Sequence, residues 1–244
     1  MGIEAVTFDC WGTLLFERDR HATYARRVEA LAVAVCGAAG AAELGRARLA
    51  LDAAWRRHIA HWEAGMASGA PEIARWALAE LAPERSGEAA RLAERFVRIG
   101  AEAEVAALAG ARDTLARLAA EGVGRALVCD TGFTPGRAVR TLLDRAGLLE
   151  LLSVTVFSDE QGVPKPHPQV FAAALAGLGA RASEAIHVGD LRRTDVSGGR
   201  GAGMGTIRIR AHYDDPIALP DADAVADSHA HLQEILDARA GACS

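Results

Sequence analysis

Residues 6–15 read VTFDCWGTLL, and this stretch decides which fold to expect. An apolar run rich in β-forming residues ends at the acid Asp9, and a Gly12-Thr13 turn follows. The pattern predicts a buried strand that carries a carboxylate at its carboxyl end. Trp11 lies between the acid and the turn, which raises the question of what chemistry Asp9 could perform beside an indole.

Beyond residue 20 the sequence pattern changes from strand to helix. Apolar residues recur at helical spacing up to about residue 100, with breaks such as Gly37, Gly65 and Pro83 between the segments. We expect no strand in this block. We interpret residues 17–100 as an all-helical insertion of roughly four helices.

From residue 101 onward, strand and helix patterns alternate. Strands are expected in RALVCDTG, LSVTVFSDE, AIHVGD, MGTIRIRA and close to ADAV. Repeated β-then-α spacing predicts a parallel sheet with helices on both faces. The expected fold is therefore α/β, a Rossmann-like parallel sheet built from residues 1–16 and 101–244 and interrupted by the helical domain.

Polar residues stand at four strand ends. They are Asp9, the pair Thr131-Gly132, Lys165 shortly after the third strand, and Asp190 with Asp195 five residues later. In open parallel sheets, ligands bind at the carboxyl ends of the strands. One acid at such a place is often only a helix cap, but all four in this order indicate a single site.

Together these stretches resemble the four motifs of the haloacid dehalogenase superfamily of hydrolases. The helical insertion lies where that superfamily places a helical cap of the C1 type, directly after the first motif. The resemblance implies that Asp9 is the nucleophile, since a carboxylate can attack phosphorus or carbon and form a covalent ester. It also implies that Thr131 binds the transferring group and that Lys165 neutralises charge.

The resemblance further implies a Mg²⁺ site. Its ligands would be Asp9, Asp190, Asp195 and the backbone carbonyl of Trp11, a set of hard oxygen donors that suits this cation. Thr13 and Gly132 would contact the substrate. On this interpretation the chain is a phosphatase of a small phosphorylated metabolite.

Trp11 supports an alternative. Phosphatases of the superfamily usually carry a second Asp there as general acid and base, and an indole cannot replace it. The 2-haloacid dehalogenases, which need no metal, carry an aromatic residue at that position. AAWRRHIAHWEAG resembles their substrate-binding segment and would give Arg56 the role of binding the substrate carboxylate or the halide.

Other stretches favour the phosphatase interpretation. The second motif reads Thr131-Gly132 rather than Ser-Asn, and Phe171 stands where dehalogenases carry Tyr. GDLRRTDVSGGRGAGM resembles the metal-binding version of the fourth motif. A non-catalytic binding protein on the same fold is a third hypothesis, because the general acid is missing. The glycine run GGRGAGMG is expected to be a loop and not a phosphate cradle, since no strand precedes it.

The composition and net charge limit the kinds of binding partner to expect. The chain has 244 residues and a net charge of −5, so no basic field indicates nucleic acid or a membrane surface. Its four cysteines are scattered and show no zinc or disulfide spacing. We expect a cytoplasmic enzyme with a small-molecule substrate, as a monomer or homodimer.

Overall fold

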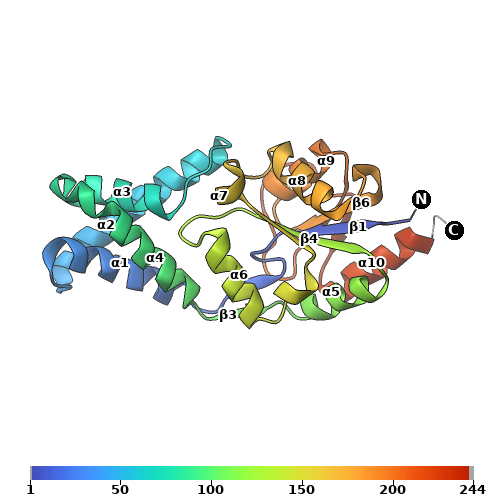
Figure 1. The fold of residues 1–244 in the computed structure, drawn as a ribbon, viewed down its shortest axis with the longest axis horizontal. Coiled ribbons are helices and arrows are strands. Elements are labelled where there is room, and N and C mark those ends of the chain that lie inside the picture. Colours follow the sequence, from blue (N-terminus) through green and yellow to red (C-terminus); the bar gives the residue numbers. More distant parts are fainter. Residues whose placement is uncertain (1, 242–244) are drawn as a thin grey trace. The chain divides into compact units, whose positions relative to one another are not determined.

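Six strands form one parallel sheet in the order β5-β4-β1-β6-β7-β8. They are β1 (Ala5–Phe8), β4 (Gly124–Cys129), β5 (Val154–Phe157), β6 (Ala185–Gly189), β7 (Gly205–Ile209) and β8 (Ala224–Ala226). The structure, a computed structural model, describes residues 2–241 (Figure 1). All six expected strands are present, and the predicted α/β fold class is confirmed.

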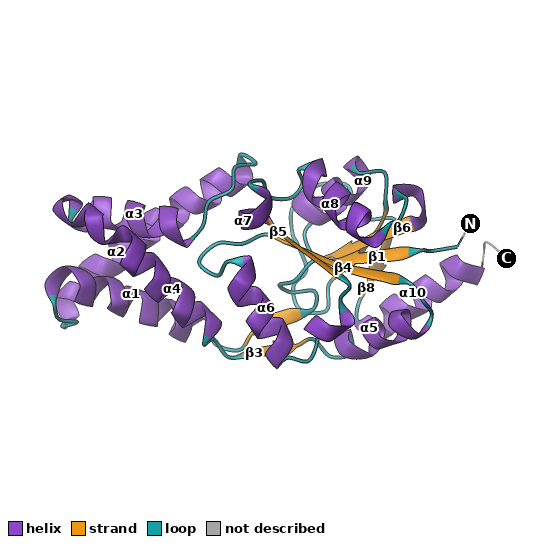
Figure 2. Cartoon of the chain, viewed as in Figure 1, coloured by secondary structure: helices purple, strands orange, loops and turns teal. Residues whose placement is uncertain are grey.

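Helices cover both faces of this sheet (Figure 2). One face packs against α8 (Pro168–Leu178) and α9 (Ser197–Gly201), and the other against α5 (Ala111–Ala120) and α10 (His229–Gly241). Because both faces are covered, β1 and β6 are buried along their whole length. This explains why their sequences are nearly continuous apolar runs rather than alternating ones.

The glycine run after Asp195 is partly helical, so its prediction as a loop was wrong. A π-helical turn over Arg192–Val196 continues into α9. A Cβ on Gly198 would lie 2.5 Å from the Phe171 ring, and one on Gly199 would lie 2.9 Å from Thr206. The glycines thus allow α9 to approach the sheet and α8 closely, which periodicity does not reveal.

Four long helices form a separate unit, as the apolar spacing predicted. They are α1 (Arg20–Cys36), α2 (Ala41–Glu63), α3 (Ala70–Leu81) and α4 (Ala89–Ala101). Asp19 caps α1, since its carboxylate accepts the Ala22 amide at 2.8 Å. Gly37 ends α1 with φ of 70°, a conformation that side chains disfavour, while its amide bonds to the Val33 carbonyl.

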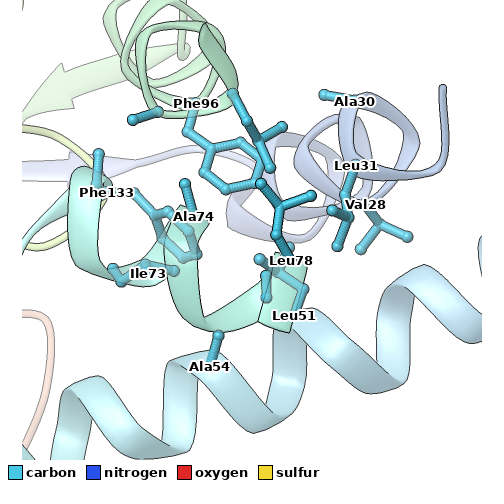
Figure 3. Packing of buried hydrophobic residues seen from close by; sticks show 14 of the residues in the cluster. Val28, Ala30, Leu31, Leu51, Ala54, Ile73, Ala74, Leu78, Phe96 and Phe133 are labelled. Atoms are coloured by element: carbon cyan, nitrogen blue, oxygen red, sulfur yellow. The ribbon is translucent and has the colours of Figure 1, made fainter. Parts of the chain in front are cut away.

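The core of the helical unit also contains a residue from outside these helices (Figure 3). Phe133 is buried there, stacks on Trp55 at 4.9 Å and meets Phe96 edge-on at 5.5 Å. Arg27 lies 4.5 Å above the same ring. Phe133 therefore fixes the segment 131–142, which contains the start of α6 (Gly136–Arg145), to the helical unit.

One small sheet was not expected. β2 (Leu15–Glu17) pairs with β3 (Val105–Ala107), and bonds from the Leu108 amide to the Leu14 carbonyl and from Arg18 to Glu104 flank the pair. Residues 18–104 lie between the two strands in the chain. Three-residue strands carry no readable alternation, so only tertiary pairing reveals them. Four short segments complete the chain: α7 (Ser158–Gln161) and the 3₁₀ turns Pro83–Glu88, Leu149–Leu151 and Ala182–Glu184.

Contacts divide the chain into two units. The first comprises residues 1–16, 105–130 and 143–244, and the second comprises 17–104 and 131–142. The sequence-based boundaries, 1–16 with 101–244 and 17–100, differ mainly in where they place 131–142. The assignment of these units as catalytic core and cap stays a prediction.

No single helix within residues 2–241 has the length and apolar composition to cross a membrane. The bent pair α1 and α2, which meet at 110°, reaches those limits only when the two helices are taken together.

Candidate active site

The carboxyl ends of β1 and β6 carry two acids. Asp9 follows β1 and Asp190 follows β6, and the two strands are neighbours in the sheet. The Asp9 amide bonds to the Val188 carbonyl at 2.8 Å, which continues the pairing to the site itself. From β1 the chain adds β4 and β5 on one side and β6 to β8 on the other. The acids therefore lie at the topological switch point, where such sheets bind ligands.

Lys165 joins two carboxylates in the sheet unit. Its Nζ lies 2.5 Å from Asp9 Oδ1 and 2.7 Å from Asp195 Oδ1, and its side chain is 2% exposed. Burial alone would lower the pKa of Lys165, but Asp195 and Asp9 outweigh it and raise this pKa well above the ordinary value. The ammonium therefore stays charged. Lys165 is also the only lysine in the sequence.

Asp195 is fully engaged by protein donors. Oδ1 accepts Lys165 Nζ and His187 Nε2, the latter at 3.2 Å, while Oδ2 accepts the Leu191 amide at 3.0 Å and the Thr194 hydroxyl at 3.4 Å. Burial would raise the pKa of Asp195, but Lys165 and His187 hold it well below its usual range. Four donors leave the Asp195 carboxylate little capacity to bind a cation, and they make it the anchor of Lys165. The predicted role of Asp195 as a Mg²⁺ ligand stays a prediction.

Asp190 is in the opposite electrostatic situation. Burial, followed by repulsion from Asp9 and Asp195, raises the pKa of Asp190 to about 9. Burial likewise raises the pKa of Asp9 to about 7, although Lys165 opposes the shift. The protein thus places two carboxylates together without enough positive charge to ionise both.

A divalent cation would supply the positive charge that Asp9 and Asp190 lack. A Cβ on Gly12 would lie 2.6 Å from Asp190 Oδ2, so the Trp11-Gly12 peptide lies against that carboxylate. Gly12 has φ of 79°, which suits glycine alone in this turn. Asp9, Asp190 and the Trp11 carbonyl are hard oxygen donors of the type that Mg²⁺ prefers. Within residues 2–241 no group of three His, Cys, Asp or Glu side chains could hold a metal, so waters and substrate would complete the shell.

The structure does not test the roles of the other predicted site residues. Thr13 is fully buried, its hydroxyl has no hydrogen-bond partner and its carbonyl faces His229 Nε2 at 2.8 Å. This burial does not favour a direct substrate contact. Thr131, Gly132 and Arg56 belong to the helical unit, where Arg56 is exposed on α2. Their proximity to Asp9 stays a prediction.

Three residues of the site were missed from the sequence. Thr7 Oγ1 and His187 Nδ1 lie 2.7 Å apart, and His187 Nε2 reaches Asp195. Asp130 Oδ1 accepts the backbone amide of Lys165 at 2.9 Å. Burial lowers the pKa of His187, so its ring is neutral. Polar residues within buried strands were the available signal, because a lone polar group there requires a partner.

Comparisons with known proteins agree with this geometry. The haloacid dehalogenase-like hydrolase family model matches residues 3–203. The chain is 29% identical over 203 residues to a phosphoglycolate phosphatase of Pectobacterium atrosepticum, covering 82% of this chain and 85% of that protein. It is 36% identical over 186 residues to a phosphoserine phosphatase of Thermus thermophilus, covering 70% and 69%.

Among solved structures, both phosphatases and dehalogenases share the fold. A 2-haloacid dehalogenase from Pseudomonas syringae superposes with a TM-score of 0.67 at 21% identity, covering 97% of this chain and 99% of that one. At this identity the likeness concerns the fold alone. The family match, the switch-point acids and the phosphatase relatives together show that the chain belongs to the haloacid dehalogenase-like hydrolases.

Proposed function

We propose that this hydrolase is a Mg²⁺-dependent phosphatase of small phosphorylated metabolites and that Asp9 is its nucleophile. One observation carries the proposal. Lys165 joins Asp9 to Asp195 at the switch point, and the nearby Asp190 lacks enough positive charge around it to be ionised. Relatives named phosphoglycolate phosphatase and phosphoserine phosphatase support a phosphomonoester as the substrate. The helical residues 17–100 would act as a cap that contributes specificity.

The reaction would proceed in two displacements on Asp9. Lys165 holds Oδ1, and the other carboxylate oxygen attacks phosphorus while the bond from phosphorus to the leaving alcohol breaks. An aspartyl phosphate forms. Water then attacks this phosphorus, inorganic phosphate leaves and the Asp9 carboxylate is restored. Lys165 offsets part of the negative charge that accumulates when a carboxylate meets a phosphate.

The proposed metal ligands are Asp9, Asp190 and the backbone carbonyl of Trp11. Bound Mg²⁺ would supply the positive charge that the two carboxylates and the phosphoryl oxygens lack. Asp195 is left out of this set because its four donors leave it little capacity to bind a cation.

Removal of the metal gives the first test. We expect EDTA to abolish hydrolysis of phosphomonoesters and added Mg²⁺ to restore it. At a Mg²⁺ concentration about 100 times its Kd, the folded wild type should gain about 2.7 kcal/mol of stability, read as a higher melting temperature. Asp190→Asn should lose most of this gain. EDTA-insensitive hydrolysis of every active substrate would contradict the proposal.

Trp11 predicts a preference for good leaving groups. An indole does not protonate a leaving alcohol, and a positioned acid contributes roughly 10²–10⁴ in rate. We expect Trp11→Asp to raise kcat for sugar phosphates at least about tenfold and to change aryl phosphates little. Trp11→Phe removes the same indole without adding an acid and should show no gain. Equal results for both variants would mean that position 11 does not determine the leaving group.

Trp11 also supports the second candidate function, hydrolysis of a carbon–halogen bond, because a halide leaves without a general acid. Halide release from short 2-chloro and 2-fluoro acids that persists in EDTA would establish it. Asp190 favours the phosphatase instead. It is buried without a cation that would ionise it, which suits a metal ligand, whereas a metal-free dehalogenase has no use for this carboxylate. The predicted roles of Thr13, Thr131, Gly132 and Arg56 as substrate contacts remain predictions.

A further inference from the structure

A chain of buried polar groups lies behind Asp9. Thr7 Oγ1 is 2.7 Å from His187 Nδ1, and His187 Nε2 is 3.2 Å from Asp195 Oδ1. The same Asp195 oxygen lies 2.7 Å from Lys165 Nζ, which in turn lies 2.5 Å from Asp9. Each group is at most 7% exposed. The chain leads from the interior of β1 through β6 and back to the residue after β1.

The direction of each hydrogen bond follows from chemistry. An ionised carboxylate only accepts, so the hydrogen of the neutral ring must lie on Nε2, toward Asp195. Nδ1 is then an acceptor, and the Thr7 hydroxyl donates to it. Asp195 thereby fixes the ring tautomer, and the Thr7 hydroxyl stabilises it by satisfying the Nδ1 acceptor.

Packing holds the His187 ring in the orientation that faces Thr7 and Asp195. Thr7 and His187 are register partners on neighbouring strands, so their side chains leave the sheet on the same side. The Phe171 ring meets the His187 ring edge-on at 5.0 Å. A Cβ on Gly199 would come within 3.0 Å of the His187 Cβ, so α9 closes the remaining space.

We propose that Thr7 and His187 are positioning residues that hold Asp195, and through it Lys165, in the orientation that Asp9 needs. This inference rests on the proposed function of Asp9 as nucleophile. Both side chains are at most 1% exposed and so are not available to a substrate, and loss of the Thr7 donor is therefore expected to lower kcat and leave KM nearly unchanged. Removal of a hydrogen-bond partner that orients a functional side chain typically lowers activity 10–100-fold.

Two substitutions of Thr7 separate hydrogen bonding from packing. Thr7→Val keeps the shape and removes the donor, whereas Thr7→Ser keeps the donor and removes a methyl group. We expect kcat to fall roughly tenfold in Thr7→Val and to stay within about threefold in Thr7→Ser, with KM within about threefold in both. A role in packing alone predicts the reverse order. Unchanged kcat in Thr7→Val, or an equal fall in both variants, overturns the proposal.

Two substitutions of His187 test the next link. His187→Gln can still donate an amide hydrogen to Asp195, whereas His187→Leu cannot. We expect kcat to fall roughly 100-fold in His187→Leu and to be partly rescued in His187→Gln. Equal kcat values in these two variants, with folding verified by circular dichroism, contradict a donor role for His187.

Nuclear magnetic resonance tests the chain independently of turnover. Because Lys165 is the only lysine, ¹⁵N-lysine labelling yields one ammonium signal, and ¹⁵N-histidine spectra compared with His187→Gln identify the His187 tautomer. We expect the Nε2–H tautomer in wild type and Thr7→Ser, with both signals altered in Thr7→Val. An Nδ1–H tautomer in the wild type, or a Lys165 signal unchanged in Thr7→Val, overturns the proposal. If the wild type hydrolyses no phosphomonoester, the proposed function fails while these spectra still decide the inference.

Discussion

Asp9→Asn is expected to reduce phosphomonoester turnover by at least about 10³-fold. An amide is a poor nucleophile, so the covalent step cannot proceed through residue 9. The substitution is nearly isosteric, and its carbonyl oxygen can still accept the hydrogen bond from Lys165. Steady-state hydrolysis of an aryl phosphate with Mg²⁺ present measures the effect.

The fold should tolerate Asp9→Asn. Burial, together with Asp195, raises the pKa of Asp9 to about 7 although Lys165 opposes the shift, so its charge is unfavourable in the metal-free protein. Neutral asparagine removes that repulsion, and we expect a melting temperature equal to the wild type or higher. Asp113→Asn, at an exposed position on α5, is the matched control and should leave turnover unchanged. Turnover that survives in Asp9→Asn would assign the chemistry to another group, and absence of turnover in the wild type would favour the non-catalytic hypothesis.

Lys165→Met should cost both activity and stability. It leaves the carboxylates of Asp9 and Asp195 buried without their ammonium partner. Breaking a buried ion pair from one side typically costs about 3–5 kcal/mol. We expect a clearly lower melting temperature and loss of turnover in the fraction that stays folded.

Lys165→Arg tests geometry at constant charge. Arginine carries a planar fork that needs more space than an ammonium, and the Lys165 side chain is only 2% exposed. We therefore expect Lys165→Arg to be nearly as inactive as Lys165→Met. Arg75→Met removes an exposed cation from α3 and is the control for loss of charge alone. Full activity in Lys165→Arg would show that position 165 requires only a positive charge.

Trp11 and Asp190 together define what is unusual about this site. The turn after Asp9 lacks the expected acid, and the acid after β6, Asp190, has a pKa raised to about 9, because it is buried beside other acids without enough positive charge to ionise it. The metal and leaving-group experiments probe these two features separately. A Mg²⁺-dependent phosphatase limited to good leaving groups would explain both the missing acid at position 11 and the raised pKa of Asp190.

The positions of the six sheet strands along the chain and the acids at their ends were readable from the sequence. Apolar runs at VTF and IHV mark buried strands, and helical spacing between residues 20 and 100 marks the insertion. These signals are local, since the period of an element depends only on neighbours along the chain. The fold class followed from them, and the family followed from the resemblance of the strand-end motifs to a known superfamily; both were confirmed.

Only the tertiary structure decided how the polar groups pair. Asp195 has the spacing of a metal ligand, and the structure shows that its carboxylate also accepts Lys165 from a distant loop and His187 from β6. Phe133 follows a sheet strand and yet packs in the helical unit. His187 forms a hydrogen bond with Thr7, which is 180 residues away in the sequence. Which donor meets which acceptor depends on strand register and side-chain direction, which come from folding and not from local pattern. The sequence thus determined which acids stand at the ends of the strands, and the fold determined which donors and acceptors they meet, because pairing depends on register between distant segments.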